Sequence, residues 1–226
     1  MNEREKIVAE LARLIQEVDL SHPVRVGIDG VDCSGKTTLS DELAEVLRGT
    51  TREIIRVSID GFHNHKNIRY RQGSLSAKGF YEDTFNNEAI ISQVLSPLGP
   101  VGDLRYNSSL FDFRTDSPSI GEWKKAARNS ILLFDGVFLQ RPALIEHWDF
   151  VVFVHVNFDE TVRRAKVRDQ YLFGSADDVE ARYLRRYIPG QEIYLCSVHP
   201  DSVANVIFDN NDPHNPILRL NKPGSY

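Results

Sequence analysis

The first 20 residues place apolar side chains at a helical spacing. Ile7, Val8, Leu11, Leu14, Ile15 and Val18 share one face of such a helix, and Glu, Lys and Arg occupy the other. The pattern predicts an amphipathic helix over 1–20 that packs on a core. A helix lying on a membrane surface is the alternative, but it would be richer in lysine and tryptophan.

Short apolar runs alternate with further helical patterns along the rest of the chain. The runs predict strands at 24–28, 54–59, 131–134, 151–156 and 203–208. Helical spacing predicts helices at 38–47, 87–95, 159–169 and 177–187. Strands this apolar are buried on both faces. The alternation therefore predicts an α/β fold with a parallel central sheet and helices on both sides.

Two stretches, 63–78 and 96–119, are too polar for core elements and too long for plain connectors. Long loops on such a sheet usually bind ligands, so we expect 61–119 to supply substrate-binding loops. The length of 226 residues suits one domain, 1–226, better than two.

A glycine-rich turn between the first strand and the next helix carries the strongest chemical signal. GVDCSGKT at 30–37 matches GxxxxGK[ST], a loop whose backbone N–H groups surround phosphate oxygens at a helix N-terminus. Lys36 is placed to reach the β and γ phosphates, and the Thr37 hydroxyl to ligate Mg²⁺. The predicted ATP-binding residues are Gly30, Asp32, Cys33, Ser34, Gly35, Lys36, Thr37 and Thr38.

Two carboxylates lie at the ends of apolar runs. In a parallel sheet the carboxyl ends of the strands line the ligand crevice. There Asp60 can accept the proton of an attacking hydroxyl, and Asp135 can hold Mg²⁺ or its waters. Both aspartates precede a glycine, so the alternative is that each is a turn residue.

A cluster of cations follows the fourth strand and predicts a lid over 163–190 that closes on phosphates. A solvated face paired with Asp169, Asp177, Asp178 and Glu180 is the alternative, and about half of the cations are expected to do only that. The cations are Arg163, Arg164, Lys166, Arg168, Arg182, Arg185 and Arg186.

The overall charge of -5 provides no field for a nucleic acid, and no window is apolar enough to span a membrane. Two distant cysteines and a charged N-terminus without a signal-peptide pattern suggest a cytoplasmic protein. Cys33 lies near a helix start, where a thiol pKa can fall, but a filler role is favoured over redox sensing. A guanine-reading Asn-Lys-x-Asp motif is not formed by the Asn221-Lys222 pair, which argues against a GTPase.

The motifs GIDGVDCSGKTTLSDELA, VSIDGFH, LLFDGVFL, DETVRRAKVRD and VIFDNNDP resemble, in this order, the uridine kinase and phosphoribulokinase group of P-loop kinases. The resemblance implies a three-layer P-loop fold with a helical lid. It also implies Mg²⁺-dependent transfer of the ATP γ-phosphoryl group to a primary hydroxyl. By position, Asp60 resembles the catalytic base, Arg164 and Arg168 resemble lid arginines on the triphosphate, and the segment after Phe208 resembles the region that flanks adenine. Members of the group often associate, so a homo-oligomer is an expectation carried by the resemblance.

The substrate-binding motifs of uridine kinases match this sequence less completely. Asp83 is the best match to the aspartate that holds ribose hydroxyls in uridine kinases, and Glu82 is the second. The run Phe111-Asp112-Phe113-Arg114 resembles a Tyr-Asp-Phe segment of the nucleoside pocket, but Phe111 replaces Tyr and Arg114 is added. Asp135 stands where uridine kinases usually have Glu. The basic stretch from His63 to Arg71 positions an acidic group or is a solvated loop.

Together these features predict an ATP-dependent kinase of a small molecule, first of all of a nucleoside such as uridine or cytidine. Another hydroxylated metabolite, such as pantothenate, a sugar or glycerate, is the alternative acceptor. A regulatory ATP-binding module that hydrolyses ATP slowly is the alternative from another class.

Overall fold

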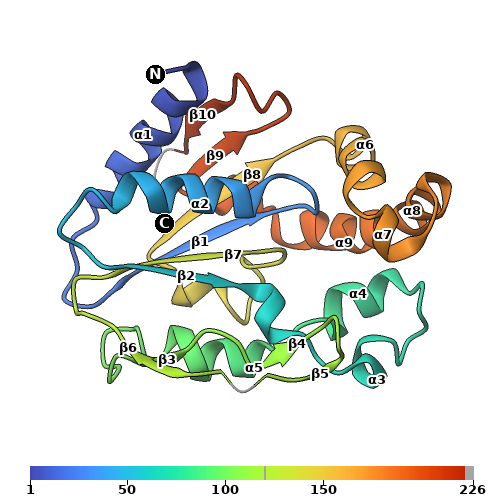
Figure 1. The fold of residues 1–226 in the computed structure, drawn as a ribbon, viewed down its shortest axis with the longest axis horizontal. Coiled ribbons are helices and arrows are strands. Elements are labelled where there is room, and N and C mark those ends of the chain that lie inside the picture. The colour runs from blue at the N-terminus through green and yellow to red at the C-terminus, as the bar shows by residue number, and fades with distance from the viewer. Residues whose placement is uncertain (120, 222–226) are drawn as a thin grey trace.

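The computed structural model describes residues 1–119 and 121–221. Two of the sequence predictions extend beyond these residues. The run compared with the guanine motif continues from Asn221 to Gly224, and the predicted domain ends at residue 226, so Lys222 to Gly224 and the end of that domain lie outside the described residues. A six-stranded sheet in the order β10-β9-β8-β1-β7-β2 forms the centre (Figure 1). Its strands are β1 (Val24–Gly30), β2 (Ile54–Ser58), β7 (Ile131–Gly136), β8 (Phe150–His155), β9 (Val206–Asp209) and β10 (Ile217–Leu220).

Helices cover both faces of the sheet and extend past its carboxyl end (Figure 1). They are α1 (Glu3–Gln16), α2 (Lys36–Leu47), α3 (Lys66–Arg69), α4 (Ala77–Asp83), α5 (Asn87–Ile90), α6 (Phe158–Arg168), α7 (Gln170–Phe173), α8 (Ala176–Arg182), α9 (Ile188–Val198) and α10 (Pro200–Val203). Single turns of 3₁₀ helix lie at Ile59–Phe62 and Ile145–His147, and π-helical turns at Ile91–Leu95 and Tyr183–Tyr187. Short strand pairs join β3 (Arg105–Asn107) to β6 (Trp123–Lys125) and β4 (Phe111–Asp112) to β5 (Ser117–Pro118).

Two apolar layers hold the sheet between the helices. On one face α1 and α2 pack residues such as Leu11 and Leu43 against β1, β7, β8 and β9. On the other face α4, the π-helical turn Ile91–Leu95 and α9 bury Phe80, Val94 and Tyr194 against the sheet. The predicted three-layer α/β arrangement is confirmed, with β9, β8, β1, β7 and β2 parallel.

Several boundaries differ from the sequence prediction for local reasons. The second strand ends at Ser58, and Asp60 lies in the 3₁₀ turn that follows. The last predicted strand starts three residues late, at Val206, because Pro200 begins the short helix α10. Strand β10 was not predicted, and it pairs antiparallel with β9.

The helical lid is more continuous than the sequence suggests, because α8 runs through a π-helical turn into α9. Pro189 lies in the first turn of α9, where the wider π turn before it accommodates the missing backbone donor. The stretch 96–119 was expected to stay out of the core. This was wrong, since Leu98, Leu104 and Tyr106 are buried.

An ion pair between Arg25 of β1 and Asp149 beside β8 is expected to be the main polar support of the sheet. The Arg25 backbone N–H, Nε and Nη2 donate to the carboxylate at 2.8, 2.9 and 2.9 Å. Asp149→Ala should lower the free energy of unfolding in urea by about 3–5 kcal/mol, because it leaves a buried guanidinium without its partner. Glu17→Ala, which breaks an exposed pair with Arg13, is the control and should change it little. Equal effects of the two variants would contradict this assignment.

Candidate active site

The loop 30–37 turns sharply between β1 and α2. Gly30 and Gly35 have φ angles of 152° and 92°, which disfavour any residue with a side chain. A Cβ at Gly30 would lie 2.4 Å from the Val154 carbonyl oxygen. The two glycines thus let the loop curl against β8 and turn into α2, as the motif predicts.

Lys36 is buried at the start of α2 without a carboxylate partner in the parts of the chain that the structure describes. Its Nζ donates to the Val31 carbonyl at 2.6 Å, and burial lowers the pKa of the ammonium group. A buried, unpaired ammonium is costly, and a phosphate oxygen would supply the missing negative charge. The residue therefore fits the triphosphate role that the motif assigns.

Thr37 and Asp135 form the pair that fits Mg²⁺. The Thr37 hydroxyl donates to Asp135 Oδ2 at 2.9 Å, and Arg56 Nη1 pairs with Oδ1 at 3.0 Å. Mg²⁺ in kinases is bound through one or two protein oxygens plus phosphates rather than by a full protein cage. In keeping with this, residues 1–119 and 121–221 contain no group of three or more His, Cys, Asp or Glu side chains suited to a metal.

Asp60 lines a cavity of about 740 Å³ together with Lys36, Thr37 and Asp135. Solvent reaches its carboxylate through this cavity, yet the surrounding protein and the nearby Asp135 raise its pKa. The structure thus brings the predicted base, the phosphate-loop lysine and the metal pair to one space. We call it the acceptor cavity.

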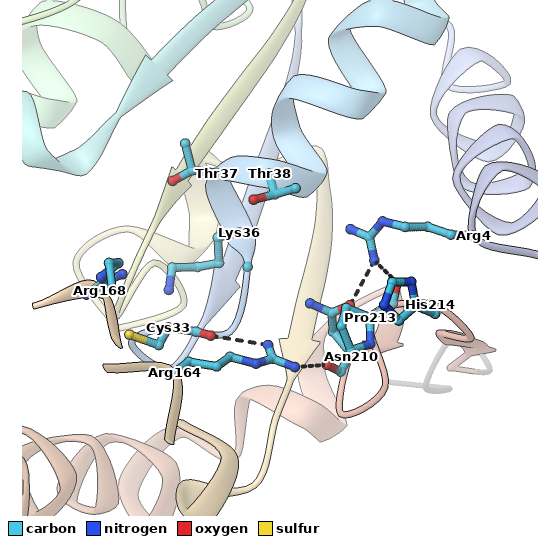
Figure 2. A pocket seen from close by; sticks show the side chains of 11 residues that line it. Arg4, Cys33, Lys36, Thr37, Thr38, Arg164, Arg168, Asn210, Pro213 and His214 are labelled. Atoms are coloured by element: carbon cyan, nitrogen blue, oxygen red, sulfur yellow. Dashed lines mark hydrogen bonds between the residues drawn. The ribbon is translucent and has the colours of Figure 1, made fainter. Parts of the chain in front are cut away.

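A second hollow of about 630 Å³ shares Cys33, Lys36, Thr37 and Arg168 with the acceptor cavity, and we call it the nucleotide cavity (Figure 2). Gly35, Lys36, Thr37, Thr38 and Cys33 line it from the loop. Gly30, Asp32 and Ser34 do not line it, although Asp32 lines the acceptor cavity. Five of the eight predicted ATP-binding residues therefore line the nucleotide cavity, and Gly30, Asp32 and Ser34 belong to the loop without lining it.

Arg164 supports the loop from below. Its Nη1 lies 3.3 Å from the Cys33 carbonyl oxygen, and its Nη2 lies 2.7 Å from that of Asn210 (Figure 2). It also pairs with Glu160. The guanidinium lines the nucleotide cavity, but its hydrogen bonds go to backbone carbonyls, so the predicted contact with the triphosphate stays a prediction.

Arg4 and Asn210 are site residues that sequence reasoning missed. Arg4 lines the nucleotide cavity from α1 and donates to Asn210 Oδ1 at 2.9 Å and to the Pro213 carbonyl at 3.0 Å (Figure 2). Asn210 Nδ2 donates to the Ser34 carbonyl at 2.7 Å. The motif VIFDNNDP marked the segment of Asn210, whereas Arg4 looks like any charged residue on the outer face of a helix.

The lid cations differ in the partners they contact. Arg163 and Lys166 pair on the surface with Glu160 and Glu180. Arg168 lines both cavities and bonds Asp169, so it is placed for the predicted triphosphate contact. Arg186 is buried beside the acceptor cavity.

The predicted substrate residues are only partly brought together. Arg114 lines the acceptor cavity, but Phe111, Asp112 and Asp83 do not. Asp83 is buried and accepts hydrogen bonds from Arg71 and from Gln72, the latter at 2.7 Å. The structure therefore does not place the predicted ribose-binding carboxylate in the cavity.

Aromatic side chains form much of the wall of the acceptor cavity. His63 stacks between Phe85 and Phe113, at centroid distances of 4.6 and 4.9 Å, and burial lowers its pKa to about 4. Tyr183 also lines this cavity and is buried, and Tyr194 of α9 is buried as well.

A buried carboxylate in β1, Asp29, was also missed by sequence reasoning. Tyr194 of α9 and Gln140 donate to it, the latter at 2.9 Å, and burial raises its pKa. The hydrogen bond between Tyr194 and Asp29 connects α9, the helix that follows the lid, to the strand that precedes the phosphate loop. Nothing in the spacing of these residues along the chain marks them as partners.

Comparison with known proteins agrees with this geometry. No family model matches the chain. A uridine kinase of Ligilactobacillus salivarius (strain UCC118) is 24% identical over 149 residues, which are 65% of this chain and 67% of that protein. Among solved structures, a possible uridine kinase from Bacillus stearothermophilus has a TM-score of 0.72 at 22% identity, over 90% of this chain and 98% of that one. D-glycerate 3-kinase from Cryptococcus neoformans has a TM-score of 0.55 at 13% identity, over 83% and 86%.

The fold is therefore that of the P-loop kinases, and the expected resemblance to the uridine kinase group is confirmed. The similar proteins that carry these names are kinases of small molecules. Within the described residues no helix has both the length and the apolar character that a bilayer crossing requires.

Cys33 is not a reactive thiol in this structure. Burial raises its pKa to about 11, whereas a redox-sensing role requires a lowered pKa. Cys196 is exposed on α9. Alkylation with iodoacetamide near neutral pH should therefore label Cys196 and leave Cys33 unmodified, as read by peptide mass spectrometry. Cys196→Ser should remove nearly all labelling, and rapid labelling of Cys33 in that variant would contradict the assignment.

Proposed function

We propose that this protein transfers the γ-phosphoryl group of ATP to a primary hydroxyl of a small molecule. The observation that carries the proposal is the acceptor cavity, where Asp60 faces the same space as Lys36 and the Thr37–Asp135 pair. Nucleotide binding alone requires no carboxylate base at that place, whereas transfer to a hydroxyl does.

The residues divide the work as follows. The loop backbone and Lys36 bind the triphosphate, and Arg168 neutralises charge from the lid. Thr37 and Asp135 would hold Mg²⁺, which supplies charge neutralisation between the β and γ phosphates. Asp60 accepts the proton of the acceptor hydroxyl. At the same time the hydroxyl oxygen of the acceptor bonds to the γ phosphorus, and the bond between the γ phosphorus and the bridging β-phosphate oxygen breaks. ADP and a phosphate monoester result.

A nucleoside such as uridine or cytidine is the first acceptor to test. The names of the similar uridine kinases support it, and so do the aromatic walls of the acceptor cavity, which suit a base. Another hydroxylated metabolite is the second candidate. It is favoured by the turn of Asp83 away from the cavity, which removes the expected ribose contact.

Asp60→Asn should lower kcat about 100-fold or more while ATP still binds, because the amide cannot accept the proton. ADP release measured across a panel of nucleosides, pantothenate, sugars and glycerate reports the rate, and calorimetry with ATP reports binding. Asp103→Asn, on an exposed turn outside both cavities, is the matched control. Full activity of Asp60→Asn would remove Asp60 from the mechanism. ATP consumption that no hydroxyl compound stimulates would favour the regulatory module.

The rate should also fall as the pH is lowered through the pKa of Asp60, because the protonated carboxyl cannot act as a base. Burial and Asp135 raise this pKa, so the fall should lie above the range of an ordinary aspartate. His63, with a pKa of about 4, stays neutral at higher pH and contributes no limb there. Profiles of kcat/KM for wild type and Asp60→Asn test this. If kcat/KM of Asp60→Asn falls at the same pH as that of the wild type, the titrating group is not Asp60.

A further inference from the structure

The acceptor cavity offers hydrogen-bond donors and few carboxylates that are free to accept. Four aspartates line it: Asp32, Asp60, Asp135 and Asp169. Asp135 is used by Thr37 and Arg56, and Asp169 by Arg168 and Tyr183. Asp32 lies in the phosphate loop, and Asp60 is reserved for the reacting hydroxyl. The cavity is thus poorly equipped to hold the two neighbouring hydroxyls of a ribose.

Two buried polar groups of this cavity have no hydrogen-bond partner within residues 1–119 and 121–221. They are Nε of Arg69 and Oγ1 of Thr84. Arg69 is only 9% exposed, although its Nη2 pairs with Asp116 at 2.6 Å. A buried donor left unpaired is costly unless a ligand completes it.

Two further arginines line the same cavity without a carboxylate within 4.0 Å in the described parts of the chain. Arg186 is 2% exposed and donates to backbone carbonyls, among them that of Ser76 at 2.9 Å. Arg114 is exposed, lies against the Phe113 ring and is close enough to Asp60 to influence its charge. An arginine fork without a carboxylate suits an anionic oxygen group.

We propose that the acceptor carries an anionic oxygen group, a carboxylate or a phosphate, which Arg69 and Arg114 bind while Asp60 receives the hydroxyl proton. The inference rests on the proposed function and narrows its acceptor to hydroxylated acids. Arg186 adds positive charge behind Arg69, to whose carbonyl oxygen its Nη2 lies at 3.4 Å. A neutral nucleoside would leave Nε of Arg69 and the guanidinium of Arg114 without an anionic partner in this cavity.

Matched acceptor pairs test the proposal, each with one anionic and one neutral member. Glycerate against glycerol and pantothenate against panthenol test a carboxylate, and ribulose 5-phosphate against ribulose tests a phosphate. Uridine and cytidine are run beside them. We expect kcat/KM for the preferred anionic member to exceed that of its neutral twin by about 10- to 100-fold, as charge-assisted hydrogen bonds imply. The pair in which the anionic member is preferred shows whether the recognised group is a carboxylate or a phosphate.

Variants locate the group in the cavity. Arg114→Gln, at an exposed position, should raise KM for the anionic acceptor about tenfold and leave KM for ATP unchanged. Arg69→Lys keeps the charge but removes the unpaired Nε, and it should act in the same direction. Arg128→Gln, exposed and outside both cavities, is the control for a lost surface cation. Thermal unfolding of each variant shows that it is folded.

The outcomes separate the two levels of the proposal. Transfer to uridine or to the neutral twins as fast as to any anion, with no effect of Arg114→Gln, overturns the anionic acceptor and leaves the kinase function standing. If no compound accepts phosphate, the kinase function fails. Binding then decides the inference, measured as the rise in melting temperature with ADP present. A rise with an anionic member that its neutral twin and Arg114→Gln lack supports the anion site, and no such rise overturns it.

Discussion

The position of β1 between β7 and β8 is the constraint on which the rest of the site depends. Because these strands are parallel and in register, their carboxyl ends meet at one edge. Gly30 ends β1 against the Val154 carbonyl, Asp135 lies near the end of β7, and Asp60 follows β2 on the far side of β7. A shift of β1 along its neighbours would separate the phosphate loop from the carboxylates that serve it.

Other segments of the chain support the phosphate loop at two of its carbonyls and at one of its amides. The Cys33 carbonyl accepts from Arg164 and the Ser34 carbonyl from Asn210. Gln191 of α9 accepts from the Asp32 amide at 2.5 Å and so fixes the side of the loop that faces the lid. Strand, lid and C-terminal segment therefore hold the loop in shape before any nucleotide arrives. Such preorganisation lowers the cost of binding.

The sequence predicts the parts of the site that are local. The spacing of loop 30–37 and the carboxylates after two apolar runs follow from short-range patterns, and the structure places Asp60 and Asp135 together. Contacts between distant segments were out of reach, since no spacing rule links Arg4 to Asn210 or Asp29 to Tyr194. Asp83 shows the same limit, because its partners Arg71 and Gln72 decide where its carboxylate points.

The contact between Arg4 and Asn210 has a consequence for how the protein matures. One residue lies in the first helix and the other just after β9, 206 positions apart, yet both line the nucleotide cavity. A chain still on the ribosome lacks this contact until Asn210 has emerged. A ligand stabilises only the state that binds it, so a nucleotide in this cavity would stabilise the chain only once both segments have come together. Such a ligand would therefore stabilise the junction between two distant segments rather than either segment alone.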